Sequence, residues 1–312
     1  RRIGFDPAGE WYQRVQIKRE GDILRFVFPT DRARAEETTA TGQLALADDF
    51  IRVASSNVRQ NSEADKTLFE MLLPLRVREM APQQGNMVIL VDKKSACYPW
   101  ELLENRWGND NKPPVVKAGF IRQFITQEFR PLPLQTGERT ALVIGDPDLG
   151  GNPDFDQLPG AQAEAEQVVQ VLGDRGYVVT DCISQSPMPI LENLHRQGWK
   201  ILHLAGHGVH EFREGNDKPL SGMVIGYHAG EGDDKKGKAI LLTPGDIQQM
   251  RFVPDLVFIN CCHLGQMHST RPLDRLGLAA NLGEEFIRMG VRAVIAAGWA
   301  VDDQAAAAFA GT

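Results

Sequence analysis

A histidine and a pair of cysteines carry the chemistry that this sequence offers. His207 follows an apolar run and precedes Gly208, while the adjacent Cys261 and Cys262 follow a second apolar run. A cysteine thiol becomes a nucleophile when a neighbouring base such as histidine removes its proton. Gly208 lets the backbone approach a substrate closely, and its N–H and that of Cys262 could form an oxyanion hole. These residues predict acyl transfer to a thiolate, followed by hydrolysis.

The elements that must position these residues are short strands. Three apolar runs have the length and composition of buried parallel strands, and each precedes polar or reactive residues: 201–204, 256–259 and 293–297. In an open parallel sheet, ligands bind beyond the carboxyl ends of the strands. His207, Cys262, Asp302 and Asp303 are therefore expected at one edge of a shared sheet.

The order of strands and helices predicts the fold class. Strands alternate with helical patterns over residues 139–312, which predicts an α/β fold with a mostly parallel sheet and helices on both faces. Residues 40–130 are expected to form an accessory α/β half that precedes it. Residues 1–39 are expected to supply N-terminal strands and a connection to an upstream region. Residues 211–238 include a glycine-rich, charged insertion around residues 230–238, which is expected to form an exposed loop.

Composition and charge exclude several classes of protein. Apolar residues make up 42% and charged residues 24%, as in ordinary globular proteins. The net charge of -7 argues against a surface that coats nucleic acid. The sequence has neither a signal peptide nor an apolar run near the ~18 residues of a membrane span, and its cysteines favour a reducing, cytoplasmic compartment. Because the chain begins at Arg1 and stops at Thr312 within an expected helix, we expect a fragment of a longer protein.

Other polar residues have simpler explanations or a competing role. Cys261 is expected to pack under the sheet, His203 to lie in the core and Trp100 to act in packing. Asp302 and Asp303 could instead cap the helix that follows them, since Asp is a favoured N-cap residue. Zinc binding is the competing site chemistry, although the spacing matches no common zinc pattern, and its candidate ligands are His203, His207, His210, Cys261, Cys262, His263 and His268.

With these residues in view, the chain resembles CHAT-domain proteins, within the caspase-like cysteine peptidases that include caspases, metacaspases and separase. The resemblance covers about residues 85–312 and rests on one strand that ends in His-Gly and a later strand that ends in the cysteine. Further segments match in the same order: residues 158–165, 221–224, 242–247, 290–294 and 299–303. The resemblance implies a caspase-like sheet, with an accessory half that resembles a degenerate peptidase subdomain.

The resemblance assigns roles to the two reactive residues. His207 matches the family's base and Cys262 its nucleophile, because the family's glycine falls three positions after the nucleophile, which here is Gly265. The cysteine pair also resembles that of metacaspases, in which the second cysteine acts. The implied enzyme is a cysteine endopeptidase with a Cys-His dyad and no metal or organic cofactor.

The resemblance also suggests how a substrate side chain is bound. In metacaspases the residue two before the nucleophile is often an acid that lines a pocket for basic side chains, whereas this chain has Asn260 there. In separase-like members an acid after the tryptophan of the fifth strand helps to bind the P1 side chain. Asp302 or Asp303 could serve in that way, and Asp146 could contribute from the end of the first strand. We therefore expect a P1 preference for Arg or Lys.

A biological setting follows from the family as well. CHAT proteins are usually regulated parts of larger bacterial chains, and relatives act in prokaryotic immunity by cleaving gasdermins or as CRISPR-linked effectors. The expected substrate is thus a specific protein partner, which could be gasdermin-like or CRISPR-linked. An activator or sensor domain is expected outside this sequence, and direct contact with nucleic acid or membrane is not. The alternative is a non-catalytic CHAT scaffold or sensor module that mediates protein–protein interaction.

Overall fold

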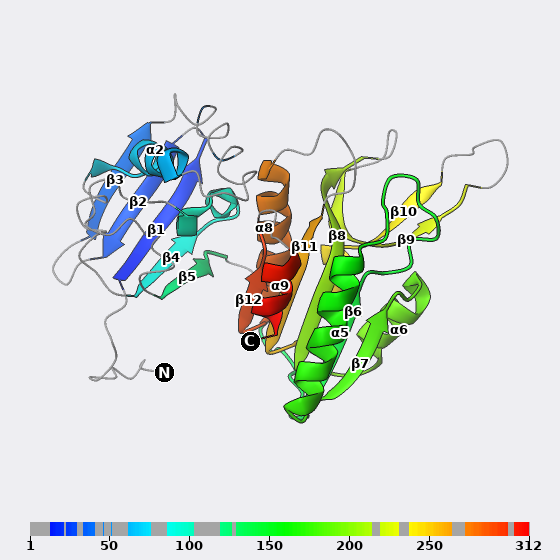
Figure 1. Cartoon of the computed structure of the whole chain (residues 1–312). Coiled ribbons are helices and arrows are strands. Elements are labelled where there is room, and N and C mark those ends of the chain that lie inside the picture. The colour runs from blue at the N-terminus through cyan, green and yellow to red at the C-terminus, as the bar shows by residue number, and fades with distance from the viewer. Residues whose placement is uncertain are drawn as a thin grey trace. The chain divides into compact units, whose positions relative to one another are not determined.

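The computed structural model describes most of the chain. Its described residues are 13–21, 23–29, 34–40, 46, 51, 62–75, 86–102, 119–126, 129–213, 219–230, 237–263, 272–298 and 303–311. They belong to two compact units, Arg1–Ile125 and Thr126–Thr312 (Figure 1).

The first unit is built on a five-stranded sheet with the strand order β3-β2-β1-β4-β5. The first three strands are antiparallel neighbours, whereas β4 and β5 join the sheet in parallel. The N-terminal strands, expected as a segment of their own, thus lie in one sheet with strands of residues 87–124. The strands are β1 (Gln13–Glu20), β2 (Ile23–Pro29), β3 (Arg34–Ala40), β4 (Met87–Val91) and β5 (Phe120–Phe124), and the helix is α2 (Ser62–Leu72).

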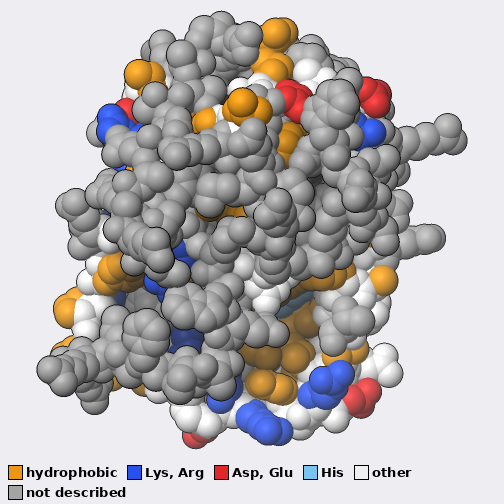
Figure 2. Space-filling model, turned by 90° about the vertical axis from the view of Figure 1, so that its left-hand side faces the viewer, with side chains coloured by type: hydrophobic (Ala, Val, Ile, Leu, Met, Phe, Trp, Pro, Cys, Tyr) orange, Lys and Arg blue, Asp and Glu red, His pale blue; other side chains and the backbone are white. Residues whose placement is uncertain are grey.

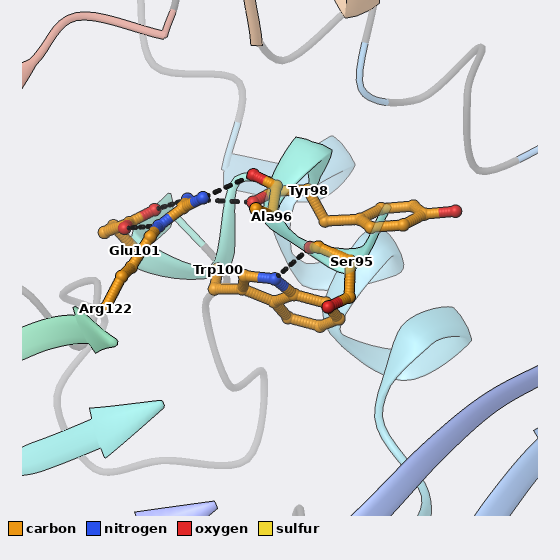
Figure 3. Close-up of polar contacts among 6 residues, drawn as sticks. All are labelled: Ser95, Ala96, Tyr98, Trp100, Glu101 and Arg122. Carbon is orange, nitrogen blue, oxygen red and sulfur yellow. Dashed lines mark hydrogen bonds and ion pairs between the residues drawn. The ribbon is translucent and has the colours of Figure 1, made fainter. Parts of the chain in front are cut away.

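Figure 3 shows how polar contacts anchor the segment between β4 and β5. The Arg122 guanidinium forms an ion pair with Glu101 and donates a hydrogen bond to the carbonyl oxygen of Ala96 at 2.5 Å. The indole Nε1 of Trp100 donates to the carbonyl oxygen of Ser95 at 2.8 Å. Trp100 is buried, which confirms its expected role in packing.

The second unit is a mostly parallel sheet with helices on both faces, which confirms the predicted fold class. Its parallel strands follow the order β7-β6-β8-β11-β12, and β9 and β10 extend the sheet from β8 in antiparallel fashion (Figure 1). The strands are β6 (Thr140–Gly145), β7 (Val178–Ile183), β8 (Ile201–Phe212), β9 (Leu220–His228), β10 (Lys238–Leu242), β11 (Leu256–His263) and β12 (Ala293–Ala296).

Alternate residues of β6 show why helices cover both faces. Val143 forms a cluster with residues of α5 (Pro159–Asp174) such as Ala165, and Ala310, the last residue of α9 (Asp303–Ala310), packs against that cluster. Leu142 belongs instead to the large core cluster of the other face. Because side chains of a strand alternate between faces, neighbouring residues reach opposite layers. The second layer contains α6 (Pro187–Arg196), α7 (Pro244–Gln248) and α8 (Pro272–Met289).

The loop expected around residues 230–238 lies mostly outside the described residues, but the segment before it is largely sheet. β8 continues to Phe212, and β9 occupies residues 220–228 with Met223, Val224 and Ile225 fully buried. Gly222 marks close packing here rather than a turn, because a Cβ on it would collide with the carbonyl oxygen of Leu242. Glycine in a strand often indicates such a close approach of another backbone.

The described surface is mixed in character. Figure 2 shows Lys and Arg side chains interspersed with Asp and Glu along the lower edge of one face. Large exposed hydrophobic residues include Leu132, Val178 and Met188. Among helices within the described ranges, none combines the length and the hydropathy that a bilayer span requires.

Candidate active site

β8 and β11 are neighbours in the sheet; Cys262 lies at the carboxyl end of β11, whereas β8 continues beyond His207 to Phe212. The strands pair in parallel as far as Asn260 opposite Ala205, and pairing resumes with His263 opposite His207. Position 262 therefore precedes the residue that pairs with His207. The structure brings the backbones of His207 and Cys262 together, while the side chain of Cys262 lies outside the described residues.

The two registered pairs also reveal a bulge at the cysteines. Between Asn260 and His263 the register shifts, so that Cys261 and Cys262 oppose one residue of β8, Gly206. Bulges disrupt the ladder locally, bend the strand and occur often beside active sites, where they re-aim a side chain. Regular alternation along β11 therefore ends at the cysteine pair.

His207 is held by a backbone carbonyl group. The ring is buried, its Nε2 lies 2.6 Å from the carbonyl oxygen of Asp156, and its centroid lies 5.2 Å from that of Phe155. A carbonyl oxygen can only accept a hydrogen bond, so Nε2 carries the proton in this contact. In the neutral imidazole, Nδ1 is then the nitrogen with basic character.

The loop between β6 and α5 fixes that carbonyl group. Asp146 adopts a φ of 41° at the end of β6, and its Oδ1 accepts a hydrogen bond of 2.7 Å from the backbone N–H of Leu158. The backbone N–H of Leu149 donates to Gln157 Oε1 at 3.2 Å. These bonds close the loop on itself just beside Asp156. Asp146, a predicted pocket residue, is only 3% exposed, and one of its oxygens is used within the loop.

Gly208 occupies a position that has no room for a side chain. A Cβ built on it would lie 2.5 Å from the carbonyl oxygen of Cys261 and would overlap Leu278 of α8. Cβ atoms do not approach other atoms so closely in real structures. Glycine thus allows the backbone of β8 to lie directly against the bulged segment of β11.

The three cysteines with described side chains have structural roles. Cys261 is 2% exposed in the core, with its Sγ 3.9 Å from the carbonyl oxygen of Leu204, which confirms that it packs under the sheet. Burial raises the pKa of the Cys97 thiol and also that of the Cys182 thiol. A raised thiol pKa lowers the thiolate fraction and hence the reactivity. Cys262 is the remaining cysteine of the chain.

A buried carboxylate links the two strands behind the predicted dyad. Glu164 of α5 accepts a 2.5 Å hydrogen bond from Asn260 Nδ2, and its other oxygen lies 3.0 Å from His203 Nε2. The latter contact is within ion-pair distance but lacks hydrogen-bond geometry. The His203 ring stacks on Phe258 with centroids 4.9 Å apart, which confirms its place in the core.

The structure describes the remaining predicted residues only in part. Helix α9 begins at Asp303, whose side chain is not described, and Asp302 lies outside the described residues. Among the described residues, no group of three or more His, Cys, Asp or Glu side chains is arranged to hold a metal ion. The side chains of Cys262, His263 and His268, three of the zinc candidates, are not among those described.

Two residues near the site were not assigned a role from the sequence. Glu164 was noted only as part of a matched helix, although its position gave a signal. It falls in line with Ala161 and Val168 on the buried stripe of α5, where a charge requires a partner. Asp156 contributes through its backbone carbonyl group, and no side-chain pattern could indicate that.

The fold defines an α/β protein with a mostly parallel sheet. A family model, CHAT domain, matches residues 62–312. The chain therefore belongs to the CHAT-domain family, as the sequence resemblance predicted.

Comparison with solved structures found a similarity to gingipain R, described as an Arg-specific cysteine proteinase. The two share 13% sequence identity with a TM-score of 0.37, over 84% of this chain and 61% of the gingipain chain. This chain thus matches less than two thirds of that chain. Comparison with curated protein sequences found no match.

Proposed function

We propose that this chain is a cysteine endopeptidase in which Cys262 is the nucleophile and His207 the general base. The observation that carries the proposal is the pairing of His207 with His263, directly beyond the bulge that contains Cys262. A second support is the contact between His207 Nε2 and the Asp156 carbonyl oxygen, because it leaves Nδ1 as the basic nitrogen.

The proposed reaction begins when Nδ1 of His207 accepts the thiol proton of Cys262. The thiolate attacks the substrate carbonyl carbon, and a C–S bond forms as the carbonyl oxygen becomes an oxyanion. The backbone N–H groups of Gly208 and Cys262 donate hydrogen bonds to that oxyanion. The C–N bond then breaks, and the amine leaves with the proton from Nδ1. A water molecule next gives a proton to Nδ1 and attacks the thioester, after which the C–S bond breaks and the thiol regains its proton.

The other cysteines support the choice of nucleophile by their surroundings. Cys261 is enclosed in the core, and burial raises the pKa of the thiols of Cys97 and Cys182. Neither environment favours a thiolate at neutral pH. Cys262 lies within the bulge, next to the residue of β11 that pairs with His207.

We further propose that the enzyme cleaves after Arg or Lys in one specific protein partner. Asp303, the first residue of α9, and the preceding residue in sequence, Asp302, are the acidic groups proposed to bind the basic P1 side chain. Asn260 of β11 and Asp146, which follows β6, come from the two strands that flank β8, and both are proposed to complete the pocket wall. A domain or partner outside this sequence would trigger cleavage, as expected for an effector in prokaryotic immunity. The alternative to this proposal is a CHAT scaffold that has no catalytic activity.

The proposal is tested with peptidyl acyloxymethyl ketones, which alkylate an active-site thiolate. The expected result is a covalent adduct on Cys262 that is lost in Cys262→Ala and greatly reduced in His207→Ala. Cys97→Ala is the matched control and should label as the unmodified protein does. If a probe set with Arg, Leu and Asp in P1 leaves Cys262 unlabelled, while the folded protein still binds its partners, the scaffold alternative replaces the peptidase.

A further inference from the structure

The buried Glu164 carboxylate contacts both strands that carry the proposed dyad. Its Oε2 accepts a hydrogen bond of 2.5 Å from Asn260 Nδ2 in β11, and its Oε1 lies 3.0 Å from His203 Nε2 in β8. Glu164 and His203 are each 2% exposed. Burying a carboxylate is unfavourable unless it is paired, so a packing role alone does not explain an acid at this position.

The contact with Asn260 fixes the last regular point of β11. Asn260 pairs with Ala205 immediately before the register shift, and the cysteine pair follows directly. A carboxylate can only accept hydrogen bonds, so Asn260 must present Nδ2 to Glu164 and turn Oδ1 the other way. The hydrogen bond from Asn260 to Glu164 therefore links the orientation of the Asn260 amide, and the point where the bulge begins, to helix α5.

The same helix also controls the histidine. The loop that ends at Leu158, the residue before α5, is closed by the bond from Leu158 N–H to Asp146. That loop supplies the Asp156 carbonyl oxygen at 2.6 Å from His207 Nε2. One end of α5 thus orients the histidine, and its second turn holds the strand that carries the cysteine.

We propose that Glu164 is a positioning residue that holds β11, through Asn260, at the spacing from β8 at which the Cys262 thiol and the His207 imidazole can exchange a proton. This role rests on the proposed peptidase function. His203 lies beside the second carboxylate oxygen at 3.0 Å, and its ring is stacked on Phe258. The hydrogen bond to Asn260 is therefore the directional contact through which Glu164 acts on β11.

The test uses iodoacetamide, which needs no substrate pocket, and follows the alkylation rate of Cys262 against pH by mass spectrometry. Asn260→Asp places two carboxyl groups against each other, so the rate at neutral pH should fall by about tenfold or more and the reactive pKa should rise. The double variant Glu164→Gln with Asn260→Asp exchanges donor and acceptor. The Gln amide can then donate to Asp and accept from His203, so most of the rate should return.

Two controls separate positioning from general folding effects. Glu166→Gln changes an exposed acid of the same helix and should leave the pH profile unchanged. Melting temperatures identify variants that lose the fold, and the exchange variant keeps the positioning claim testable if Asn260→Asp unfolds. The positioning role would be overturned if a folded Asn260→Asp variant had the same pH profile of Cys262 alkylation as the unmodified protein. It would also be overturned if the exchange variant were no more reactive than Asn260→Asp. Identical profiles for the unmodified protein and His207→Ala would instead reject the peptidase function itself.

Discussion

His207 in β8 pairs with His263 in β11, one step beyond a bulge that contains Cys261 and Cys262. This pairing fixes the register of the two strands beside the proposed reactive residues. The contact of His207 Nε2 with the Asp156 carbonyl oxygen then selects the nitrogen that can act as a base. In the proposed mechanism, these two backbone features, a bulge and a carbonyl group, prepare the side chains of His207 and Cys262 for proton transfer.

The close approach at Gly208 predicts a stability cost for any side chain there. In Gly208→Ala the added methyl group meets the Cys261 carbonyl oxygen and Leu278, so β8 and β11 must separate. Overpacking of this kind costs about 1–3 kcal/mol, occasionally more. Urea unfolding should show a lower midpoint with an unchanged slope.

A second glycine provides the control for that measurement. A Cβ on Gly137 meets no atom within 4 Å, so Gly137→Ala should change the free energy of unfolding by no more than about 0.5 kcal/mol. Equal effects of the two substitutions would mean that the contact at Gly208 is not restrictive.

Burial of the other cysteines predicts selective alkylation. Because burial raises the pKa of the Cys97 and Cys182 thiols, each holds less thiolate at a given pH than an ordinary cysteine. At about pH 7.5 iodoacetamide should modify Cys262 first in the native protein, and their reactivity should rise only at higher pH. Peptide mapping after timed quenching measures the order, and all four cysteines should react in urea. Native Cys97 or Cys182 reacting as fast as Cys262 would contradict this order.

The anchor at Arg122 predicts a large effect on the first unit. Arg122→Ala leaves Glu101 without its ion-pair partner and removes donors to two backbone carbonyl groups (Figure 3). Breaking a largely buried pair on one side costs about 3 kcal/mol. Unfolding followed by the fluorescence of Trp100 would detect the change, provided that the other tryptophans are replaced by phenylalanine.

An exposed ion pair in the same unit is the comparison for Arg122. Arg25 and Glu20 form a pair at 2.8 Å, with side chains 37% and 51% exposed. Arg25→Ala should therefore change the free energy of unfolding by about 0–1 kcal/mol. If Arg122→Ala lowered the free energy of unfolding as little as Arg25→Ala, the contacts of Arg122 would contribute little to the stability of the first unit.

The proposed acidic pocket predicts a charge-dependent substrate preference. Replacement of Asp302 or Asp303 by Asn should lower kcat/KM for a P1 Arg peptide by about tenfold, equivalent to ~1.4 kcal/mol. The effect on a P1 Leu peptide should be small, because that side chain carries no charge. Profiling of a fluorogenic peptide library before and after each substitution provides the measurement. Asp174→Asn, at an exposed position in α5, is the control.

A strong preference for acidic or leucine side chains in P1 would contradict the pocket. An unchanged Arg preference in both single variants and in the double variant would remove Asp302 and Asp303 from it.

Local pattern was enough to predict the central strands. Residues 201–204 and 256–259 were predicted as buried strands, and the structure buries Leu202, Leu204, Val257 and Ile259 in one core cluster. The order of such runs with intervening helices predicted the parallel sheet. The proximity of positions 207 and 262 followed from the rule that parallel strands share one carboxyl edge.

Long-range packing explains what the sequence did not reveal. β9 was missed because Gly222 and Gly226 resemble turn residues, whereas they make room for Leu242 and Pro187. The bulge at the cysteines depends on the pairing of β8 with β11 and leaves no mark in β11 alone. The contact between Glu164 and Asn260 joins a helix to a strand far along the chain, so the local sequence around either residue does not predict its partner.

The pH dependence of Cys262 alkylation in the unmodified protein and in His207→Ala tests the central claim most directly. We expect the unmodified protein to reach half-maximal reactivity below the ordinary thiol value of about 8.5, and His207→Ala to do so at least about one pH unit higher. Superimposable profiles, with both proteins folded, would show that the imidazole does not act on the sulfur and would contradict the account.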